Sequence, residues 1–353
     1  MFEQSALNPA TDFFQILRRA ASWRHRSERL QVRLGAETSP NPTVYFLTPD
    51  YPKPAGGIKV IYRHVDILNH AGIRAFVLHQ KTGFRCTWFE NSTQIAYRRN
   101  TKILCGDILV IPEICVDILD RLPAPIKYVI FNQGIHLTWT PTGSNPVKYY
   151  DAGNGLRGVV TVSLHSQNML RFAFGRDSFR VHVGIDSSIF HPIEGPRQNR
   201  LAYMPRRMPK DARLVLEILR SRGMLDGWEV VELDRMSQTE VAAQLRQSKI
   251  FLAFTYQEGF GLPAAEAMAC GNYVVGYHGF GGQEFFLSDF SAPVATGDVM
   301  GFAQAVETAI LNERSQPGWC RKRGSEASDF VLSEYSLARE YEEVRDFYEG
   351  LMR

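Results

Sequence analysis

The chain has 353 residues, of which 44% are hydrophobic and 22% are charged, and its formal net charge is +3. This length exceeds what one ordinary hydrophobic core needs, so it predicts two domains. The near-average composition excludes a disordered or coiled-coil chain. The small net charge gives no reason to expect a nucleic-acid partner.

Hydropathy and cysteine spacing together predict a cytoplasmic location. We expect no transmembrane helix, because no apolar run approaches roughly 18 residues. We expect no secretion signal, because the start MFEQSALNPATDFF lacks the basic-then-apolar layout of one. The five cysteines are scattered without a C-x-x-C spacing, which favours reduced thiols over disulfides or a zinc site.

Residues 1–40 are predicted to form a basic extension outside the two domains. The segment 11–34 holds six arginines, and its apolar side chains are Phe13, Phe14, Ile16, Leu17 and Trp23. A basic amphipathic helix can lie peripherally on the anionic inner face of a membrane, or it can dock on the body of the protein. Both interpretations stay open.

From Thr43 onward, short apolar runs alternate with helical patterns. Runs rich in β-branched and aromatic residues predict strands at 43–48, 74–79, 107–112, 126–132 and 157–163. A helical pattern that ends at a glycine separates the first two. Such alternation predicts a parallel sheet covered on both faces, and we assign residues 41–185 to an N-terminal domain of this kind.

Periodicity is lost over residues 186–199, where proline and glycine accumulate, and this segment is the predicted linker. A second alternating series fills residues 200–330 and predicts a C-terminal domain of the same kind. The last segment, 331–353, predicts a charged amphipathic helix that packs back toward the N-terminal domain. The predicted fold is therefore α/β, with two doubly wound domains that bind ligands at the carboxyl ends of their strands.

The stretch FTYQEGFGLPAAEAMACG, residues 254–271, places two acids around a glycine-rich turn at one of these strand ends. We expect Glu258 in the loop and Glu266 in the first turn of the following helix. The glycines would let a substrate approach closely and leave backbone N–H groups near a helix N-terminus for phosphate. Taken singly, the acids have plainer explanations, because Glu266 could offset the helix dipole and Glu258 could be a solvated loop residue.

The string E-G-F-G-L-P-x-x-E-A-M-A-C-G, residues 258–271, resembles the E-x7-E signature of retaining GT-B glycosyltransferases of the family 4 type. Residues 56–78 resemble the glycine loop and helix of that family, and residues 181–192 resemble its interdomain linker. The resemblance spans roughly residues 43–350. It implies a GT-B fold, in which two Rossmann-like domains face each other across a cleft.

The resemblance also implies a role for each acid. Glu266 would hydrogen-bond the ribose of a nucleotide sugar. Glu258 would be a catalytic residue that contacts hydroxyls of the donor sugar near the anomeric carbon. A carboxylate is a strong acceptor for such hydroxyl donors. The backbone amides of Phe260, Gly261 and Leu262 would face the donor diphosphate.

Cationic side chains are expected to neutralise the leaving diphosphate, with no metal ion and no other cofactor. The family shows G-R-L followed by a lysine five residues after the arginine, whereas residues 203–211 read Y-M-P-R-R-M-P-K-D. We assign Arg206 and Lys210 to this diphosphate clamp, with Arg207 as the substitute if the loop aligns differently. Surface cations before a helix are the alternative explanation.

Three further positions lie at predicted strand ends. Gly57 resembles a residue of the family's glycine loop and would approach the donor diphosphate, although any tight turn uses a glycine pair. His136 is assigned as a second catalytic residue that contacts the donor sugar or the acceptor, against the alternative of a histidine satisfied within its loop. The string G-G-Q-E at 281–284 resembles a family loop around the nucleobase.

The predicted function is the retaining transfer of a hexose or deoxyhexose from a nucleotide diphosphate sugar to a glycan, a lipid-linked sugar or a small molecule. One alternative keeps the fold and changes the chemistry to a sugar-nucleotide epimerase or hydrolase, which the intact E-x7-E string disfavours. The other is a non-catalytic GT-B subunit that binds glycan or a partner enzyme. The irregular loop at 205–210 is the feature that favours it.

Overall fold

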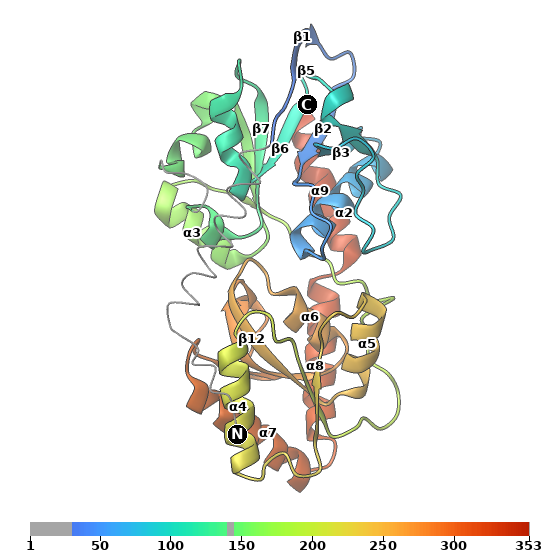
Figure 1. The fold of residues 1–353 in the computed structure, drawn as a ribbon, viewed down its shortest axis with the longest axis vertical. Coiled ribbons are helices and arrows are strands. Elements are labelled where there is room, and N and C mark those ends of the chain that lie inside the picture. The colour runs from blue at the N-terminus through green and yellow to red at the C-terminus, as the bar shows by residue number, and fades with distance from the viewer. Residues whose placement is uncertain (1–29, 140–144, 353) are drawn as a thin grey trace, which may run out of the picture. The chain divides into compact units, whose positions relative to one another are not determined.

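A computed structural model describes residues 30–139 and 145–352 of the chain (Figure 1). The chain folds into two compact units. Unit 1 comprises the residues up to Val160, together with 173–178 and 348–353, and unit 2 comprises 161–172 and 179–347. Most of the basic segment 11–34, with its predicted membrane contact, lies outside the described residues.

A sheet forms the centre of unit 1, where the strands follow the order β4-β3-β2-β6-β7-β8 and every pairing from β4 to β7 is parallel. Its strands are β2 (Val44–Leu47), β3 (Ala75–His79), β4 (Ile95–Tyr97), β6 (Ile108–Pro112), β7 (Lys127–Asn132) and β8 (Leu156–Thr161). All five strands that the sequence predicts in this region are present, and the predicted helix is α2 (Gly56–His70).

Short elements complete unit 1 and the segments around it. A strand pair that the sequence pattern does not predict joins β1 (Leu34–Thr38) to β5 (Ile103–Cys105). The 3-10 helices are η1 (Arg98–Asn100), η2 (Glu113–Arg121), η3 (Ile135–Leu137), η4 (Pro146–Tyr150) and η5 (Ala152–Asn154). Helix α3 (Leu164–Phe174) and strand β9 (Phe179–Arg180) follow.

Aromatic rings fill one face of the unit 1 sheet. Phe46 of β2 packs edge-on against His64 of α2, with ring centroids 6.3 Å apart, and lies 5.7 Å from the ring of Tyr348. His64 in turn stacks on Phe131 of β7 at 4.7 Å. These buried side chains fix α2 across β2 and β7, so the start of α2 is held near the carboxyl ends of both strands.

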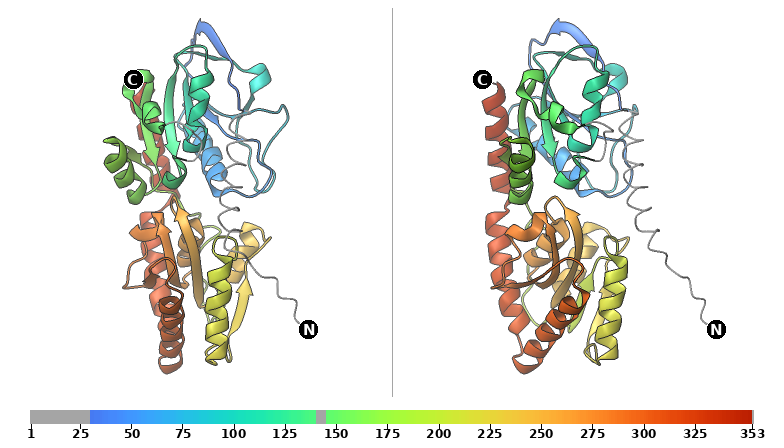
Figure 2. Two further views of the ribbon diagram at one scale, coloured as in Figure 1. Left: turned by 60° about the vertical axis from the view of Figure 1, so that its left-hand side comes forward. Right: turned by 90° about the vertical axis from the view of Figure 1, so that its left-hand side faces the viewer.

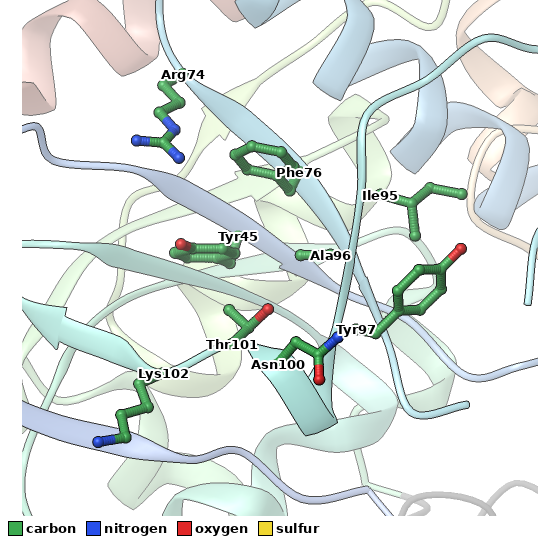
Figure 3. A pocket seen from close by; sticks show the side chains of 9 residues that line it. All are labelled: Tyr45, Arg74, Phe76, Ile95, Ala96, Tyr97, Asn100, Thr101 and Lys102. Atoms are coloured by element: carbon green, nitrogen blue, oxygen red, sulfur yellow. The ribbon is translucent and has the colours of Figure 1, made fainter. Parts of the chain in front are cut away.

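A cavity of about 370 Å³ lies toward the amino ends of β2 and β3, beside β4 (Figure 3). Tyr45 and Phe76, each the second residue of its strand, stack there with centroids 5.9 Å apart, and Arg74 lies over the Phe76 ring. The other lining residues are Ile95, Ala96, Tyr97, Asn100, Thr101 and Lys102. The cavity is therefore separate from the carboxyl ends of the strands, where ligands of such sheets bind.

Unit 2 is built on a parallel sheet with the strand order β11-β10-β12-β13-β14. Its strands are β10 (Arg200–Tyr203), β11 (Glu229–Glu232), β12 (Ile250–Glu258), β13 (Tyr273–Phe280) and β14 (Ser291–Val294). Its helices are α4 (Pro209–Ser221), α5 (Gln238–Gln247), α6 (Leu262–Ala269), the 3-10 helix η6 (Gly281–Glu284), α7 (Val299–Ser315), α8 (Trp319–Glu334) and α9 (Leu337–Met352). The yellow-green α4 and the red α8 flank this sheet on opposite sides (Figure 2).

The core of unit 2 places β12 at the centre of the sheet. Phe254 of β12 stacks on Phe302 of α7 at 4.5 Å, and Tyr277 of β13 meets the same ring at 5.1 Å. On the other side, α6 and α8 come so close that a Cβ on Gly324 would lie 1.9 Å from the carbonyl oxygen of Gly271. Packing on both faces therefore fixes the direction in which β12 leaves the sheet.

Helix ends in unit 2 are satisfied by specific side chains. Ser237 and Glu240 form a reciprocal capping box at the start of α5. At the start of α8, the Glu313 carboxylate of α7 accepts the N–H groups of Gly318 at 3.2 Å and Cys320 at 2.8 Å. Glu313 thereby joins the end of α7 to the start of α8.

All five cysteines lie in described residues and are free thiols. Cys86, Cys115, Cys270 and Cys320 are buried, whereas Cys105 at the end of β5 is exposed. Burial raises the pKa of each of the four buried thiols, to about 12 for Cys270. Within the described residues, no helix has the length and hydropathy needed to cross a membrane.

Candidate functional site

Glu258 is the last residue of β12, and the expectation that it lies in the loop is wrong. It pairs with Phe280 of β13, after a register shift between Thr255 and Glu258. An irregularity of this kind adds a residue to one strand and re-aims the side chains beyond it. The strand thus continues past the apolar run that the sequence shows and presents Glu258 at its carboxyl end.

The backbone around Glu258 is strained. Gln257 has a φ of 49° and Phe280 has a φ of 69°, and both are positive values at residues other than glycine. Each such residue costs about 1–3 kcal/mol and persists only where its surroundings hold it, as at binding sites. The two therefore mark the paired ends of β12 and β13 as a shaped site.

Glu266 lies one turn further into helix α6 than the sequence predicts. The helix begins at Leu262, after Gly261 with a φ of 102°, so Glu266 is its fifth residue and lies in the second turn. Leu262 can begin the helix because Gly261 takes the left-handed conformation that ends the loop. Phe260 anchors this loop in the core, 5.1 Å from the ring of Phe285 and 5.0 Å from that of Tyr335.

The glycine loop after β13 lies directly against the turn after Glu258. A Cβ on Gly281 would stand 2.2 Å from the carbonyl oxygen of Gly259, and one on Gly279 would stand 3.2 Å from the Cβ of Glu258. Only glycine fits at such a distance from a backbone oxygen. These glycines are therefore required by the contact between the two loops, in addition to any contact with a ligand.

Glu284 holds this glycine loop in place. Its carboxylate accepts hydrogen bonds from the N–H of Leu164 at 2.7 Å, the guanidinium of Arg180 at 2.7 Å and the hydroxyl of Tyr335 at 2.9 Å. The three donors come from three separate segments of unit 2. Glu284 thus sets the shape of the loop.

Among the predicted cations, the structure brings Arg207 to Glu258. The Nε of Arg207 lies 2.7 Å from Oε1 of Glu258, and its Nη2 lies 3.2 Å from Oε2. Arg206 is exposed, and Lys210 is the second residue of α4. A lysine at a helix N-terminus opposes the helix dipole, so an anion bound beside it would be favourable.

In unit 1, Gly57 lies beyond the carboxyl end of β2 and His136 beyond that of β7. Gln133 connects the two segments. The Gln133 side chain donates to the carbonyl oxygen of Gly57 at 3.1 Å, and its own oxygen lies 3.2 Å from where a Cβ on Gly57 would stand. The glycine at position 57 therefore makes room for Gln133. His136 follows three residues later, in the 3-10 helix η3.

Glu113, which no sequence motif singles out, lies under the loop that carries His136. Glu113 follows β6 directly, is 4% exposed, and accepts the N–H of Gln133 at 3.0 Å. Burial raises the pKa of this carboxyl to about 7, although backbone hydrogen bonds lower it. The one signal in the sequence is an acid placed immediately after a strand of apolar residues.

The described site has no cluster of side chains suited to a metal ion. Within residues 30–139 and 145–352, no group of three or more histidine, cysteine, aspartate or glutamate side chains could hold one. Arginine and lysine side chains precede or begin α4 at this site, and helix N-termini add partial positive charge.

Comparison with known proteins places the site within a family match. Residues 229–326, which include both acids of the E-x7-E string, match the family model described as glycosyl transferases group 1. No curated protein matches the chain.

Solved structures resemble the chain over most of its length. A sucrose-phosphate synthase from Thermosynechococcus elongatus is 14% identical, with a TM-score of 0.64 over 88% of this chain and 99% of that one. A glycosyltransferase from Rickettsia africae ESF-5 is 14% identical, with a TM-score of 0.61 over 89% and 100%. HepE from Anabaena, in complex with UDP-glucose, is 12% identical, with a TM-score of 0.61 over 87% and 99%. These likenesses show the α/β GT-B fold that the sequence predicts.

Proposed function

We propose that this GT-B protein is a glycosyltransferase that uses a nucleotide diphosphate sugar as donor. The observation that carries the proposal is the placement of Glu258, paired with Arg207, at the carboxyl end of the central strand of unit 2, with Glu266 in the second turn of the helix that follows. That edge is where ligands of doubly wound sheets bind. The match of residues 229–326 to glycosyl transferases group 1 supports the same conclusion.

In this proposal, unit 2 binds the donor. Glu266 accepts hydrogen bonds from the ribose, and Glu258 accepts them from hydroxyls of the donor sugar. Arg207, with Lys210 at the start of α4, faces the diphosphate, and the N-terminus of α6 adds its backbone N–H groups. Arg207 takes the place assigned first to Arg206 from sequence, because Arg207 is the cation in contact with Glu258.

We propose retention of anomeric configuration and a reaction without a metal ion. The bond from C1 of the sugar to the diphosphate oxygen breaks, and a bond from C1 to the acceptor oxygen forms on the same face. The acceptor hydroxyl proton passes to the leaving diphosphate, whose charge the cations stabilise. This route needs no separate general base.

UDP-glucose is the first donor to test, because HepE, which shares the fold, has been crystallised with it. The acceptor in this proposal is a glycan, a lipid-linked sugar or a small molecule. A lipid-linked acceptor would fit the basic segment 11–34, since arginines favour an anionic membrane surface.

The proposal is tested with a panel of UDP, GDP, dTDP and ADP sugars. Thermal shift finds the nucleotide that binds, and release of free sugar from the donor then measures turnover without a known acceptor. Binding and slow release are expected for one nucleotide class, with activity unchanged by EDTA. Binding without any release would favour the non-catalytic alternative, and no binding to any donor would overturn the proposal.

Variants of the two acids separate donor binding from turnover. Glu266→Ala is expected to weaken nucleotide binding, and Glu258→Ala is expected mainly to lower kcat, each by about 1.5–3 kcal/mol for a lost bond to a charged group. NMR of the newly formed glycoside reports its anomeric configuration. Full activity of Glu258→Ala would show that the donor sugar lies elsewhere.

A further inference from the structure

Glu113 is a buried acid in unit 1 for which the proposed chemistry has no use. It follows the last residue of β6, opens the 3-10 helix η2, and is 4% exposed. A buried carboxyl group is costly unless hydrogen bonds compensate it. Its partners therefore indicate what it does.

Apart from its own N–H, those partners are backbone groups of the loop that follows β7. Oε2 of Glu113 accepts the N–H of Gln133 at 3.0 Å, and the N–H of Gly134 also bonds to the carboxylate. Its Oε1 is 3.2 Å from where a Cβ on Gly134 would stand, so a larger residue there would displace it. One acid thus fixes two successive peptide groups just before the 3-10 helix that carries His136.

The same contact extends to a third chain segment through Gln133. The side-chain amide of Gln133 donates to the carbonyl oxygen of Gly57, at the start of α2, at 3.1 Å. Behind the loop, Asn132 donates to the hydroxyl oxygens of Thr138 at 2.8 Å and of Tyr150 at 3.0 Å. The carboxyl end of β6, the loop after β7 and the start of α2 are thereby joined.

We propose that Glu113 is a positioning residue, which holds the loop from Gln133 to His136 and, through Gln133, the start of α2 in the geometry that substrate needs. The inference rests on the proposed function for the roles of His136 and Gly57. It does not rest on that function for the connection itself, which is a property of unit 1.

The protonation state of Glu113 should control this connection. As a carboxylate it accepts strongly through both oxygens, whereas the acid form carries an O–H donor on one oxygen and accepts an N–H only weakly there. Burial raises its pKa to about 7, so about half of the carboxyl groups are ionised at that pH and the connection strengthens as pH rises through it. The titratable and charged groups on the elements packed around it are Cys115, Asp117, Asp120 and Arg121 on η2, Lys127 and Tyr128 on β7, His136 on η3, and Lys148, Tyr149 and Tyr150 on η4.

The titration of Glu113 near pH 7 can be told apart from that of the groups around it. Burial raises the pKa of Cys115 and of Tyr150, so both are neutral near pH 7. Lys148 is paired with Asp120 at 2.8 Å, and Arg121 with Asp117 at 2.7 Å. Because histidines as a class titrate near neutral pH, the test compares variants that all keep His136.

The first test measures donor turnover from pH 5.5 to 9 in the wild type, Glu113→Gln and Asp117→Asn. In the wild type, kcat is expected to rise with pH through about 7. Glu113→Gln should lower kcat roughly 10- to 100-fold, as expected for a misplaced group, leave the donor KM within about twofold, and remove the rise. Asp117→Asn, an acid-to-amide change on the same 3-10 helix, should keep the wild-type profile. An unchanged kcat and profile in Glu113→Gln would overturn the proposal.

The second test needs no substrate, so it stands even if the proposed function fails. Trp139 ends the described part of this loop, packs 5.5 Å from the ring of Phe174 and is 39% exposed. Its fluorescence, obtained as the difference from Trp139→Phe, should titrate with a midpoint near pH 7 in the wild type and lose that step in Glu113→Gln. A flat wild-type signal, or the same step in Glu113→Gln, contradicts the proposal. The wild-type titration remains decisive if the Glu113 variant does not fold.

Discussion

At the scale of single residues, the central feature of the site is the ion pair between Arg207 and Glu258. Arg207 contacts Glu258 with two nitrogens, and 16% of the Glu258 side chain is exposed against 51% of that of Arg207. A paired guanidinium holds a carboxylate in one orientation more firmly than a lysine does. Arg207 therefore both orients Glu258 and presents a positive charge at the strand end.

Replacing Arg207 tests this pairing. Arg207→Ala should lower kcat/KM for the donor roughly 10- to 150-fold, which corresponds to about 1.5–3 kcal/mol of transition-state stabilisation. Glu258 loses its ion-pair partner, and the diphosphate loses the positive charge that faces it. The comparison is Arg206→Ala, the neighbouring arginine in the same loop, which should lose much less. Steady-state donor release measures both. A larger loss in Arg206→Ala would return the clamp to the first assignment from sequence.

The sequence singles out Glu258 and Glu266 because both belong to one short string of residues, whereas it does not show which side chains lie beside them. Glu113 contacts Gln133 only because β6 and β7 pair in the fold, so no local sequence pattern predicts the contact. The sequence places Glu258 in the loop because the irregularity after Thr255 leaves no mark in the residue pattern.

At the scale of elements, two glycines inside helices have opposite expected effects. Gly324→Ala in α8 should destabilise the protein by about 1–3 kcal/mol, because its Cβ would meet the carbonyl oxygen of Gly271 at 1.9 Å. Gly350→Ala in α9, where nothing lies within 4 Å, should stabilise it by up to about 1 kcal/mol through helix propensity. Urea unfolding measures both. Equal effects would show that α8 can move away from α6.

Glu313, which joins α7 to α8, should make the free energy of unfolding depend on pH. Burial alone would raise its pKa, but Lys249 at 2.8 Å and the N–H groups of Cys320 and Gly318 lower it. A depressed pKa contributes stability that is present above the unfolded value of 4.5 and is lost as pH falls below it. Glu313→Gln should reduce the free energy of unfolding at pH 7 and flatten its fall below pH 5. A parallel fall in both proteins would contradict this.

Element prediction from sequence succeeded where the residue pattern is continuous or capped. Strands such as β6 and β12 are continuous apolar runs, and Ser237 marks the start of α5 with its capping box. It failed for the pairing of β1 with β5, because strands of five and three residues carry too few side chains for a period to show.

At the scale of the whole molecule, we predict that a nucleotide stabilises unit 2 when it binds. UDP at about 100 times its Kd should stabilise the fold by about 2.7 kcal/mol, and hydrogen exchange should show this protection in the core strands of unit 2. At the same UDP concentration the stabilisation should fall to about 1.3 kcal/mol or less in Glu266→Ala, because the lost bond weakens binding by about 1.5–3 kcal/mol. Protection confined to strands of unit 1 would show that the nucleotide binds there.

The overall α/β architecture could be predicted from the sequence because two alternating series of strands and helices are long and regular. The assignment of residues 173–178 to unit 1 could not, because this segment joins residues distant in the chain. The end of the C-terminal segment, which the sequence analysis expects to pack back toward the N-terminal domain, also belongs to unit 1, where the ring of Tyr348 packs on Phe46 of β2.

The burial of four of the five thiols makes the protein ready for site-specific labelling without removal of its own cysteines. A maleimide dye reacts with the thiolate, so it should attach at Cys105 on unit 1 and spare the buried thiols, whose pKa values are raised. A second cysteine at Met300, which is 68% exposed at the start of α7 on unit 2, would add a partner dye. Energy transfer between the two dyes would then follow the separation of the units as a donor sugar is added.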